Sequence, residues 1–156
     1  MDELLGGYDC KLDVKGRLMV PAALKRSIPD VDREGLIICR GFEKSLIIYP
    51  KKVWDGIVKE MHNLNYWETK KRHFLRIFTR DAVELTLDAA GRVLLPKSLL
   101  DFAEITTDLF LSGQFDKIEV WNKKNYEAIY DDFPEDFAAL AEEVMGDPKK
   151  GAADGE

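Results

Sequence analysis

Several features are scarce in this 156-residue sequence, and each absence excludes a class of protein. No apolar run reaches the roughly 18 residues that a membrane-spanning helix requires. The first residues, MDELLGGYD, contain neither a basic segment nor a long apolar one, so we expect no secretory signal. Cys10 and Cys39 are the only cysteines, and their spacing suits neither a metal site nor a disulfide framework. These absences predict a cytoplasmic protein with buried, reduced thiols and no membrane partner.

Motifs of catalysis and metal binding are also missing. His62 and His73 are the only histidines, and neither has a cysteine or carboxylate at ligand spacing. The sequence contains no glycine-rich phosphate loop, no His-Glu-x-x-His helix and no nucleophile elbow. We therefore predict a protein that is not an enzyme, with no catalytic residues, no metal, no cofactor and no small-molecule substrate.

Basic residues are absent between Glu127 and Asp147, so the net charge of −6 is unevenly distributed along the chain. Residues 127–156 contain ten acidic and two basic residues, whereas residues 1–126 carry a net charge of +2. The acidity is thus a property of the C-terminal segment. A polyanionic partner for the rest of the chain remains open, because binding depends on local clusters of charge.

The most informative feature is an internal repeat. The segment KLDVKGRLMVPAALKRSI (11–28) matches TLDAAGRVLLPKSLLDFA (86–103). The pairs of identical residues are Leu12 and Leu87, Asp13 and Asp88, Gly16 and Gly91, Arg17 and Arg92, Pro21 and Pro96, and Leu24 and Leu99. A weaker match relates residues 36–57 to residues 108–129 and equates Gly41 with Gly113. The chain therefore contains two copies of one supersecondary unit.

Each copy is predicted to place an Asp-x-x-Gly turn between two short strands, which in the first copy cover residues 8–12 and 17–21. Aspartate at the first position can accept backbone N–H bonds, and glycine at the fourth can adopt positive φ. Pro21 and Pro96 then stand where short helices begin, a position that tolerates proline.

Further elements follow from hydrophobic patterning. Strands are expected at 35–41, 45–50, 108–113 and 117–122, with only a loop around residues 29–35. Helices are expected at 51–64, with one apolar face, and at 65–81, with Phe74, Leu75, Ile77 and Phe78 towards the core. Residues 134–145 can form an acidic amphipathic helix, and the sequence from Gly146 onward is typical of disorder.

We predict an α+β fold that is mainly β. Neither copy alone can bury a sufficient core or cover its sheet edges, so two copies should pack together into a closed or nearly closed pseudo-symmetric barrel. The expected organisation is a first repeat at 1–58, a helical linker at 59–82, a second repeat at 83–130, and an acidic helix and tail at 131–156.

With its doubled Leu-Asp-x-x-Gly-Arg motif, each followed by proline, the sequence resembles the MraZ family over residues 1 to about 135. That resemblance implies two SpoVT/AbrB-like half-domains forming a swapped-hairpin, double-psi-like β-barrel. It also implies a nucleoid-associated transcriptional regulator that acts as a repressor. Such a regulator binds repeated double-stranded promoter DNA upstream of the division and cell-wall gene cluster. The resemblance further implies a homo-oligomeric ring.

The candidate DNA-binding residues come from two sources. The resemblance assigns Asp13, Arg17, Asp88 and Arg92 through the motif. The first copy adds nearby cations, which are Lys11, Lys15, Lys25 and Arg26. We expect Asp13 to order the turn and pair with Arg17, while Arg17 contacts a guanine edge or a phosphate and the lysines contact phosphates. Because the second copy lacks these cations, we expect its turn to be mainly a structural partner.

Simpler interpretations remain open. A surface hairpin with a local ion pair explains the second turn about as well as a role in DNA binding does. The run Lys70, Lys71 and Arg72 is best explained as a solvated helix face, with DNA contact or a salt bridge between protomers as alternatives. The competing function is a scaffold or interaction protein whose basic turns bind acidic partners. An antitoxin-like module shares the fold, but the fused second copy speaks against it.

Overall fold

A computed structural model describes residues 2–131 and 136–146. The chain divides into two compact units, Met1–Lys123 and Lys124–Glu156, and each is described by itself. The segment predicted to be disordered lies outside the described residues, apart from Gly146.

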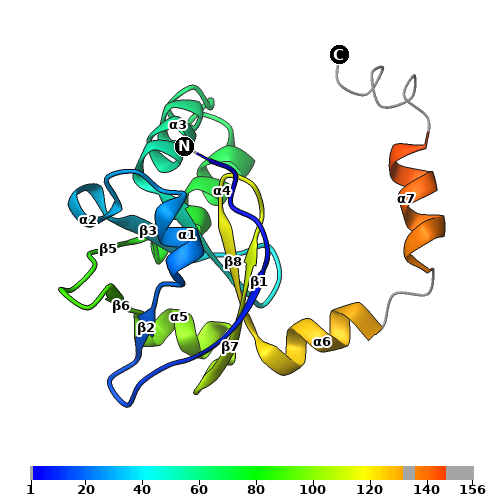
Figure 1. The fold of residues 1–156 in the computed structure, drawn as a ribbon. Helices are drawn as coiled ribbons and strands as arrows, with labels where there is room; N and C mark the ends of the chain where they lie inside the picture. The colour runs from blue at the N-terminus through cyan, green and yellow to red at the C-terminus, as the bar shows by residue number, and fades with distance from the viewer. Residues whose placement is uncertain (1, 132–135, 147–156) are drawn as a thin grey trace. The chain divides into compact units, whose positions relative to one another are not determined.

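The first unit is built on two antiparallel sheets (Figure 1). The strands are β1 (Gly7–Lys11), β2 (Arg17–Met19), β3 (Leu36–Arg40), β4 (Leu46–Pro50), β5 (Val83–Leu85), β6 (Arg92–Leu94), β7 (Asp108–Gly113) and β8 (Ile118–Asn122). Six of them form one sheet in the order β1-β7-β8-β4-β3-β5, and β2 pairs with β6 in the other. The predicted strand segments are thus confirmed.

Strands of the two copies are interleaved in these sheets. β1 of the first copy pairs with β7 of the second, β5 of the second pairs with β3 of the first, and β4 pairs with β8. Tyr8 and Val83 are equivalent residues of the two copies, because each lies five residues before the aspartate of its turn. Tyr8 lies opposite Leu111 and Val83 lies opposite Ile38, so Ile38 and Leu111 are equivalent as well. The predicted equivalence of Gly41 and Gly113 is therefore wrong by one residue, because the β7–β8 connection is one residue shorter than the β3–β4 connection.

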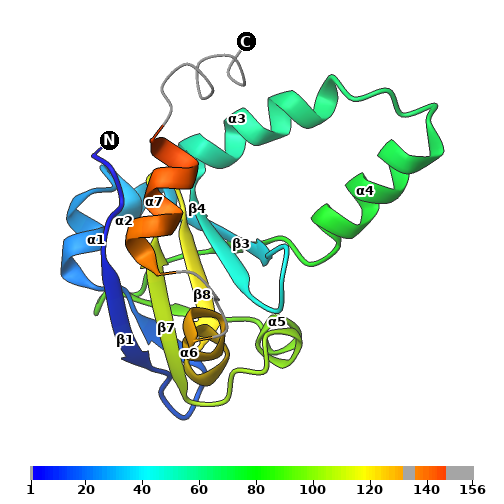
Figure 2. The same cartoon turned by 90° about the vertical axis from the view of Figure 1, so that its right-hand side faces the viewer.

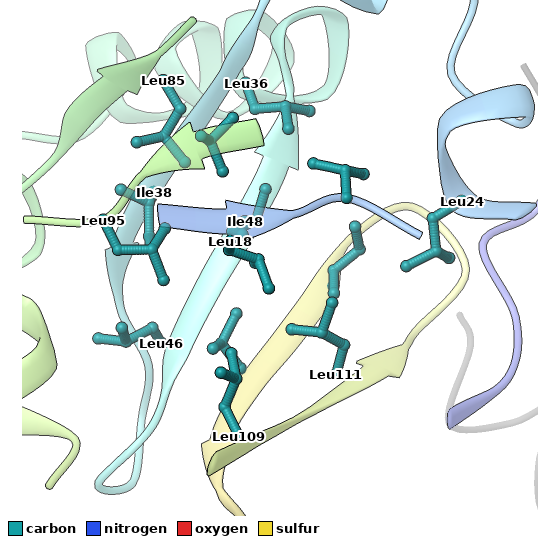
Figure 3. Packing of buried hydrophobic residues seen from close by; sticks show 14 of the residues in the cluster. Leu18, Leu24, Leu36, Ile38, Leu46, Ile48, Leu85, Leu95, Leu109 and Leu111 are labelled. Atoms are coloured by element: carbon teal, nitrogen blue, oxygen red, sulfur yellow. The ribbon is translucent and has the colours of Figure 1, made fainter. Parts of the chain in front are cut away.

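One hydrophobic core lies between the small sheet and the large one. Figure 3 shows Leu18 of β2 and Leu95 beside β6 among Ile38, Ile48 and Leu109 of the large sheet. All five side chains are at most 2% exposed. Both copies contribute to this core, so the apolar faces are buried mutually, as the repeat predicted.

Helices connect and flank the strands. They are α1 (Ala22–Arg26), α2 (Val31–Glu34), α3 (Lys51–His62), α4 (Thr69–Arg80), α5 (Lys97–Phe102), α6 (Lys123–Asp131) and α7 (Phe137–Met145). Pro21 and Pro96 directly precede α1 and α5, as predicted. The short α2 was not predicted, and its start requires Asp30 at φ 60°.

The class prediction holds only in its coarser form. The fold is mixed helix and strand, but the described helices contain more residues than the described strands, so "mainly β" is wrong. No closed barrel is found among the described strands: β1 and β5 are the two edges of an open sheet. The physical reason is that β2 and β6 bond to each other instead of joining those edges.

Helices α3 and α4 form a hairpin that extends from the strands, as Figure 2 shows. Near the sheet, Trp54 and Phe78 pack at 5.9 Å between ring centroids, over a small cluster that contains Cys39. Burial raises the pKa of the Cys39 thiol to about 12. Two residues predicted to face the core, Phe74 and Ile77, are instead 42% and 43% exposed. The hairpin contacts the sheet only near its base, so these side chains have no layer to cover them.

The second unit contains α7 and all of α6 except its first residue. Asp136 caps α7 by accepting a 2.7 Å hydrogen bond from the Ala139 backbone N–H, and α7 confirms the predicted amphipathic helix from residue 137 onward. Neither helix contains a buried residue. Within the described ranges, no helix is both long and apolar enough to span a bilayer.

Candidate nucleic-acid interface

The first candidate turn is held together by its own aspartate. Asp13 Oδ1 accepts hydrogen bonds from the backbone N–H groups of Lys15 and Arg17, each at 2.9 Å. Its other oxygen, Oδ2, accepts from Arg17 Nε at 2.6 Å. Gly16 has φ +82° and donates its N–H to the Asp13 carbonyl at 3.0 Å. The predicted carboxylate bonds, positive glycine φ and Asp–Arg pair are therefore all present.

The second turn repeats this geometry. Asp88 Oδ1 accepts from the backbone N–H groups of Ala90 and Arg92 at 2.9 Å, and Oδ2 accepts from Arg92 Nε at 2.9 Å. Gly91 has φ +83° and donates to the Asp88 carbonyl. The repeat in sequence is thus a repeat in hydrogen bonding.

The two turns are joined into one structure. β2 and β6 pair antiparallel, and the bonds extend beyond the strands: Val20 N–H donates to the Gly91 carbonyl, and Leu95 N–H donates to the Gly16 carbonyl, both at 3.1 Å. Arg92 Nη1 also lies 3.9 Å from Asp13 Oδ2. The turns of two distant segments therefore form a single site, which we call the paired turns (residues 13–17 and 88–92).

Hydrogen bonding favours the ionised form of both aspartates. The pKa of Asp13 is lowered chiefly by the backbone N–H of Arg17, then by the Arg17 side chain and the Lys15 backbone, against an opposing effect of burial. The pKa of Asp88 is lowered in the same way by the backbone N–H groups of Arg92 and Ala90 and by the Arg92 side chain. Each carboxylate is thus used inside its own turn.

The arginines keep donors available. Arg17 bonds Asp13 through Nε, and its two terminal Nη groups form no hydrogen bond within the described part of the chain. The Arg17 and Arg92 side chains are 29% and 32% exposed. At the tip of the first turn, Val14 is fully exposed, although the motif does not specify this position.

A cation of the first copy lies near the turn of the second copy. Lys25, on α1 of the first copy, lies beside the second turn: a Cβ placed on Gly91 would be 3.6 Å from Lys25 Nζ. Leu100 of the second copy correspondingly lies beside Gly16 of the first turn. The copies exchange their helices across the paired turns, so the second turn has Lys25 as a neighbour although its own copy carries Leu100 at the equivalent position.

The remaining predicted cations differ in their surroundings. Lys11 ends β1, lies 3.7 Å from Asp108 and has a side chain that is 79% exposed. Lys15 is exposed in the first turn. Arg26 is exposed on α1 and forms no bond with either turn within the described residues. Lys25 also lies 3.5 Å from Asp32 of α2.

Within the described segments, no group of three or more histidine, cysteine or carboxylate side chains could hold a metal ion.

The fold and the turns together define the class: this is a protein of two interleaved β repeats that presents paired Asp-x-x-Gly-Arg turns. The family profile described as "MraZ protein, putative antitoxin-like" matches residues 4–77 and again residues 78–147. The chain belongs to the MraZ family.

Curated relatives agree with this assignment. A protein of Christiangramia forsetii is 42% identical over 147 residues, covering 94% of this chain and 95% of the relative. One from Flavobacterium psychrophilum is 43% identical over 147 residues, covering 94% of each. One from Bacteroides thetaiotaomicron is 34% identical over 152 residues, covering 96% of this chain and 97% of the relative. All three bear the name "Transcriptional regulator MraZ", so the chain is a member of a family of transcriptional regulators.

Proposed function

We propose that this protein is a sequence-specific DNA-binding transcriptional regulator whose paired turns contact double-stranded promoter DNA. The observation that carries the proposal is the side-by-side placement of two ordered turns, each with an arginine fixed at Nε by its own aspartate. In this proposal it acts in the cytoplasm at the nucleoid, represses the division and cell-wall gene cluster, and assembles as a ring homo-oligomer on repeated sites.

Arginine supplies the base recognition. With Nε bonded to Asp13, the two Nη groups of Arg17 remain for a bidentate contact with guanine O6 and N7 or with a phosphate. The aspartate limits side-chain motion before binding, so less conformational entropy is lost in the complex. Val14 can contact the methyl group of thymine.

Lysines around the turns supply affinity that does not depend on sequence. Lys15 lies in the first turn and Lys25 beside the second, so both turns have a cation for phosphate contacts. One chain still offers few such contacts. A ring that presents the paired turns of several protomers would bind regularly repeated DNA more tightly by raising the effective concentration of each turn.

The deciding experiment measures binding of Arg17→Ala to the gene's own upstream DNA at two salt concentrations. Loss of one bidentate contact predicts weakening of about 5- to 150-fold per site, with relaxed sequence preference. Lys15→Ala should weaken binding to all sequences and reduce the salt dependence. Arg76→Ala is the charge-matched control, because this exposed residue on α4 forms no ion pair within the described residues.

Binding by Arg17→Ala that equals the parent, with fold and oligomer intact, would overturn the proposal. Steep salt dependence together with preference for a repeated promoter sequence separates DNA regulation from the competing scaffold function. A scaffold that binds acidic proteins would show salt dependence without any preference among DNA sequences.

A further inference from the structure

An apolar groove lies on the side of the first unit that carries the α3–α4 hairpin. Its volume is about 470 Å³, and it is lined by the β3–β4 connection, β4, α4 and Phe102 of α5. The aromatic and aliphatic lining includes Phe42, Ile47, Phe74 and Ile77. Arg40 also lines the groove, with its guanidinium 4.2 Å from the centre of the Phe102 ring.

This groove is incompletely covered within the unit. Phe42 is 80% exposed, and Phe74 and Ile77 are each more than two-fifths exposed. Although α3 and α4 each have twelve residues and an apolar face, neither contains a buried residue. A continuous set of exposed large apolar side chains is characteristic of a surface that binds another protein.

Helix α7 also has an apolar face that is not buried. Phe137, Leu140, Ala141 and Val144 lie on one face at helical spacing, yet none is buried. An isolated helix of nine residues is only marginally stable in water, so α7 gains from packing of this face. An amphipathic helix placed in an apolar groove is a common mode of recognition.

Charge complements the apolar match. Helix α4 contains five basic residues and no acidic one, and Lys70 and Lys71 lie one turn before Phe74 on the same face. Helix α7 contains Glu142 and Glu143, with no basic residue. Lys71 is paired with Glu68 at 2.9 Å, and Glu43 lies on the groove beside Lys44, so the charge match rests on Lys70, which forms no ion pair within the described residues. An acidic helix suits this basic end of α4 better than a basic one would.

We infer that the groove of one protomer receives α7 of a second copy of this chain. The inference rests on the homo-oligomer of the proposed function and specifies the contact that builds it. Because groove and helix are different surfaces, the contact is heterologous, and a heterologous contact closes into a ring when the rotation between protomers permits. The acidic C-terminal helix is therefore an assembly element.

Photo-crosslinking of the full chain tests which copy supplies the helix. A photoreactive phenylalanine analogue replaces Val144, and the variant is prepared once with nitrogen-14 and once with nitrogen-15. The two preparations are dissociated, mixed and allowed to reassemble before irradiation. Crosslinks from residue 144 to peptides containing Phe42 or Phe74 should join light to heavy chains. Crosslinks confined to chains of one label, which would mean that α7 docks on its own protomer, would overturn the inference.

Charge reversal tests the same contact without a label. Glu143→Lys should lower the oligomer mass in native mass spectrometry at concentrations where the parent is fully assembled, and adding Lys70→Glu should restore it. Arg76→Ala is the control, because residue 76 lies on the opposite face of α4 from Phe74. An unchanged mass in Glu143→Lys, or no recovery in the double variant, would contradict the inference.

The failure of this inference can be distinguished from failure of the proposed function. If the parent is oligomeric but α7 crosslinks elsewhere, the interface is wrong and DNA binding by Arg17 is unaffected. If the parent is monomeric at all concentrations and still binds DNA through Arg17, both the interface and the ring are wrong, while DNA recognition by the paired turns stands.

Discussion

At the scale of single residues, Asp13 and Asp88 satisfy the turns in which they lie. Each carboxylate accepts two backbone N–H bonds and one arginine Nε bond, which are groups that would otherwise need water. A negative charge placed where DNA is proposed to bind is thus neutralised locally. The arginine is fixed and the aspartate is shielded by the same bond.

The lowered pKa of Asp13 predicts how the variant Asp13→Asn should respond to pH. Because the folded pKa lies below the ordinary value of 3.8, the stabilisation is complete above that value and is lost as pH falls through the folded pKa. Asp13→Asn should therefore be less stable than the parent at pH 7, and the difference should disappear in strong acid. Urea unfolding at several pH values measures this difference.

Two related variants make that measurement specific. Asp88→Asn should show the same pH dependence, because Asp88 accepts an equivalent set of bonds. Asp101→Asn removes an exposed carboxylate that pairs with Lys97 at 3.3 Å, so the stability should hardly change. A stability difference for Asp13→Asn that persists unchanged below pH 2 would show that its effect is not due to ionisation.

At the scale of elements, the paired turns depend on backbone conformations that suit glycine. Gly16 and Gly91 both have φ above +80°, in the left-handed region that other residues adopt at a cost. The carbonyls of both glycines also accept the bonds that connect the turns to the opposite copy. Conformation and pairing are therefore coupled at these two positions.

Replacing Gly91 by alanine should destabilise the protein by about 1–3 kcal/mol through backbone strain. Sterics contribute little, because a Cβ would meet Lys25 and Met19 only at ordinary contact distances of 3.6 and 3.9 Å. Gly56→Ala is the matched control: on α3 an added Cβ has no neighbour within 4 Å, and the change should stabilise by about 0.5–1 kcal/mol. Urea denaturation measures both, and a neutral Gly91→Ala would contradict the strain argument.

At the scale of the whole molecule, the two copies are not separable domains. The first copy supplies β1, β3 and β4 to the large sheet, and each of these bonds along one side to a strand of the second copy. The core between the sheets likewise draws leucines and isoleucines from both copies. Each copy completes the sheet and core of the other.

This arrangement predicts that residues 1–82 alone will not form a folded monomer. Without β5, β6, β7 and β8, the half-chain would expose sheet edges and half of the shared core to water. Circular dichroism and light scattering should show an unfolded chain or a dimer that pairs two identical halves. A cooperatively folded monomer would contradict the interleaved core as the source of stability.

Much of the local structure could be predicted from sequence because its causes are local. The turn of residues 13–17 needs only an aspartate, a glycine and an arginine at fixed spacing, and all three act as predicted. Strand positions also followed from alternation and apolar runs. The errors concern non-local features: helical periodicity predicts Phe74 and Ile77 in the core, but periodicity cannot show whether a layer covers that face.

The sequence by itself determined the repeat, the hydrogen bonds inside each turn and the placement of proline before α1 and α5, since these depend on neighbours along the chain. Only the tertiary structure decided that Lys25 lies beside Gly91 of the other copy, and that the large sheet remains open. The physical reason is that pairing between β2 and β6 brings distant segments together, and no local preference specifies which copy's helix packs against which turn.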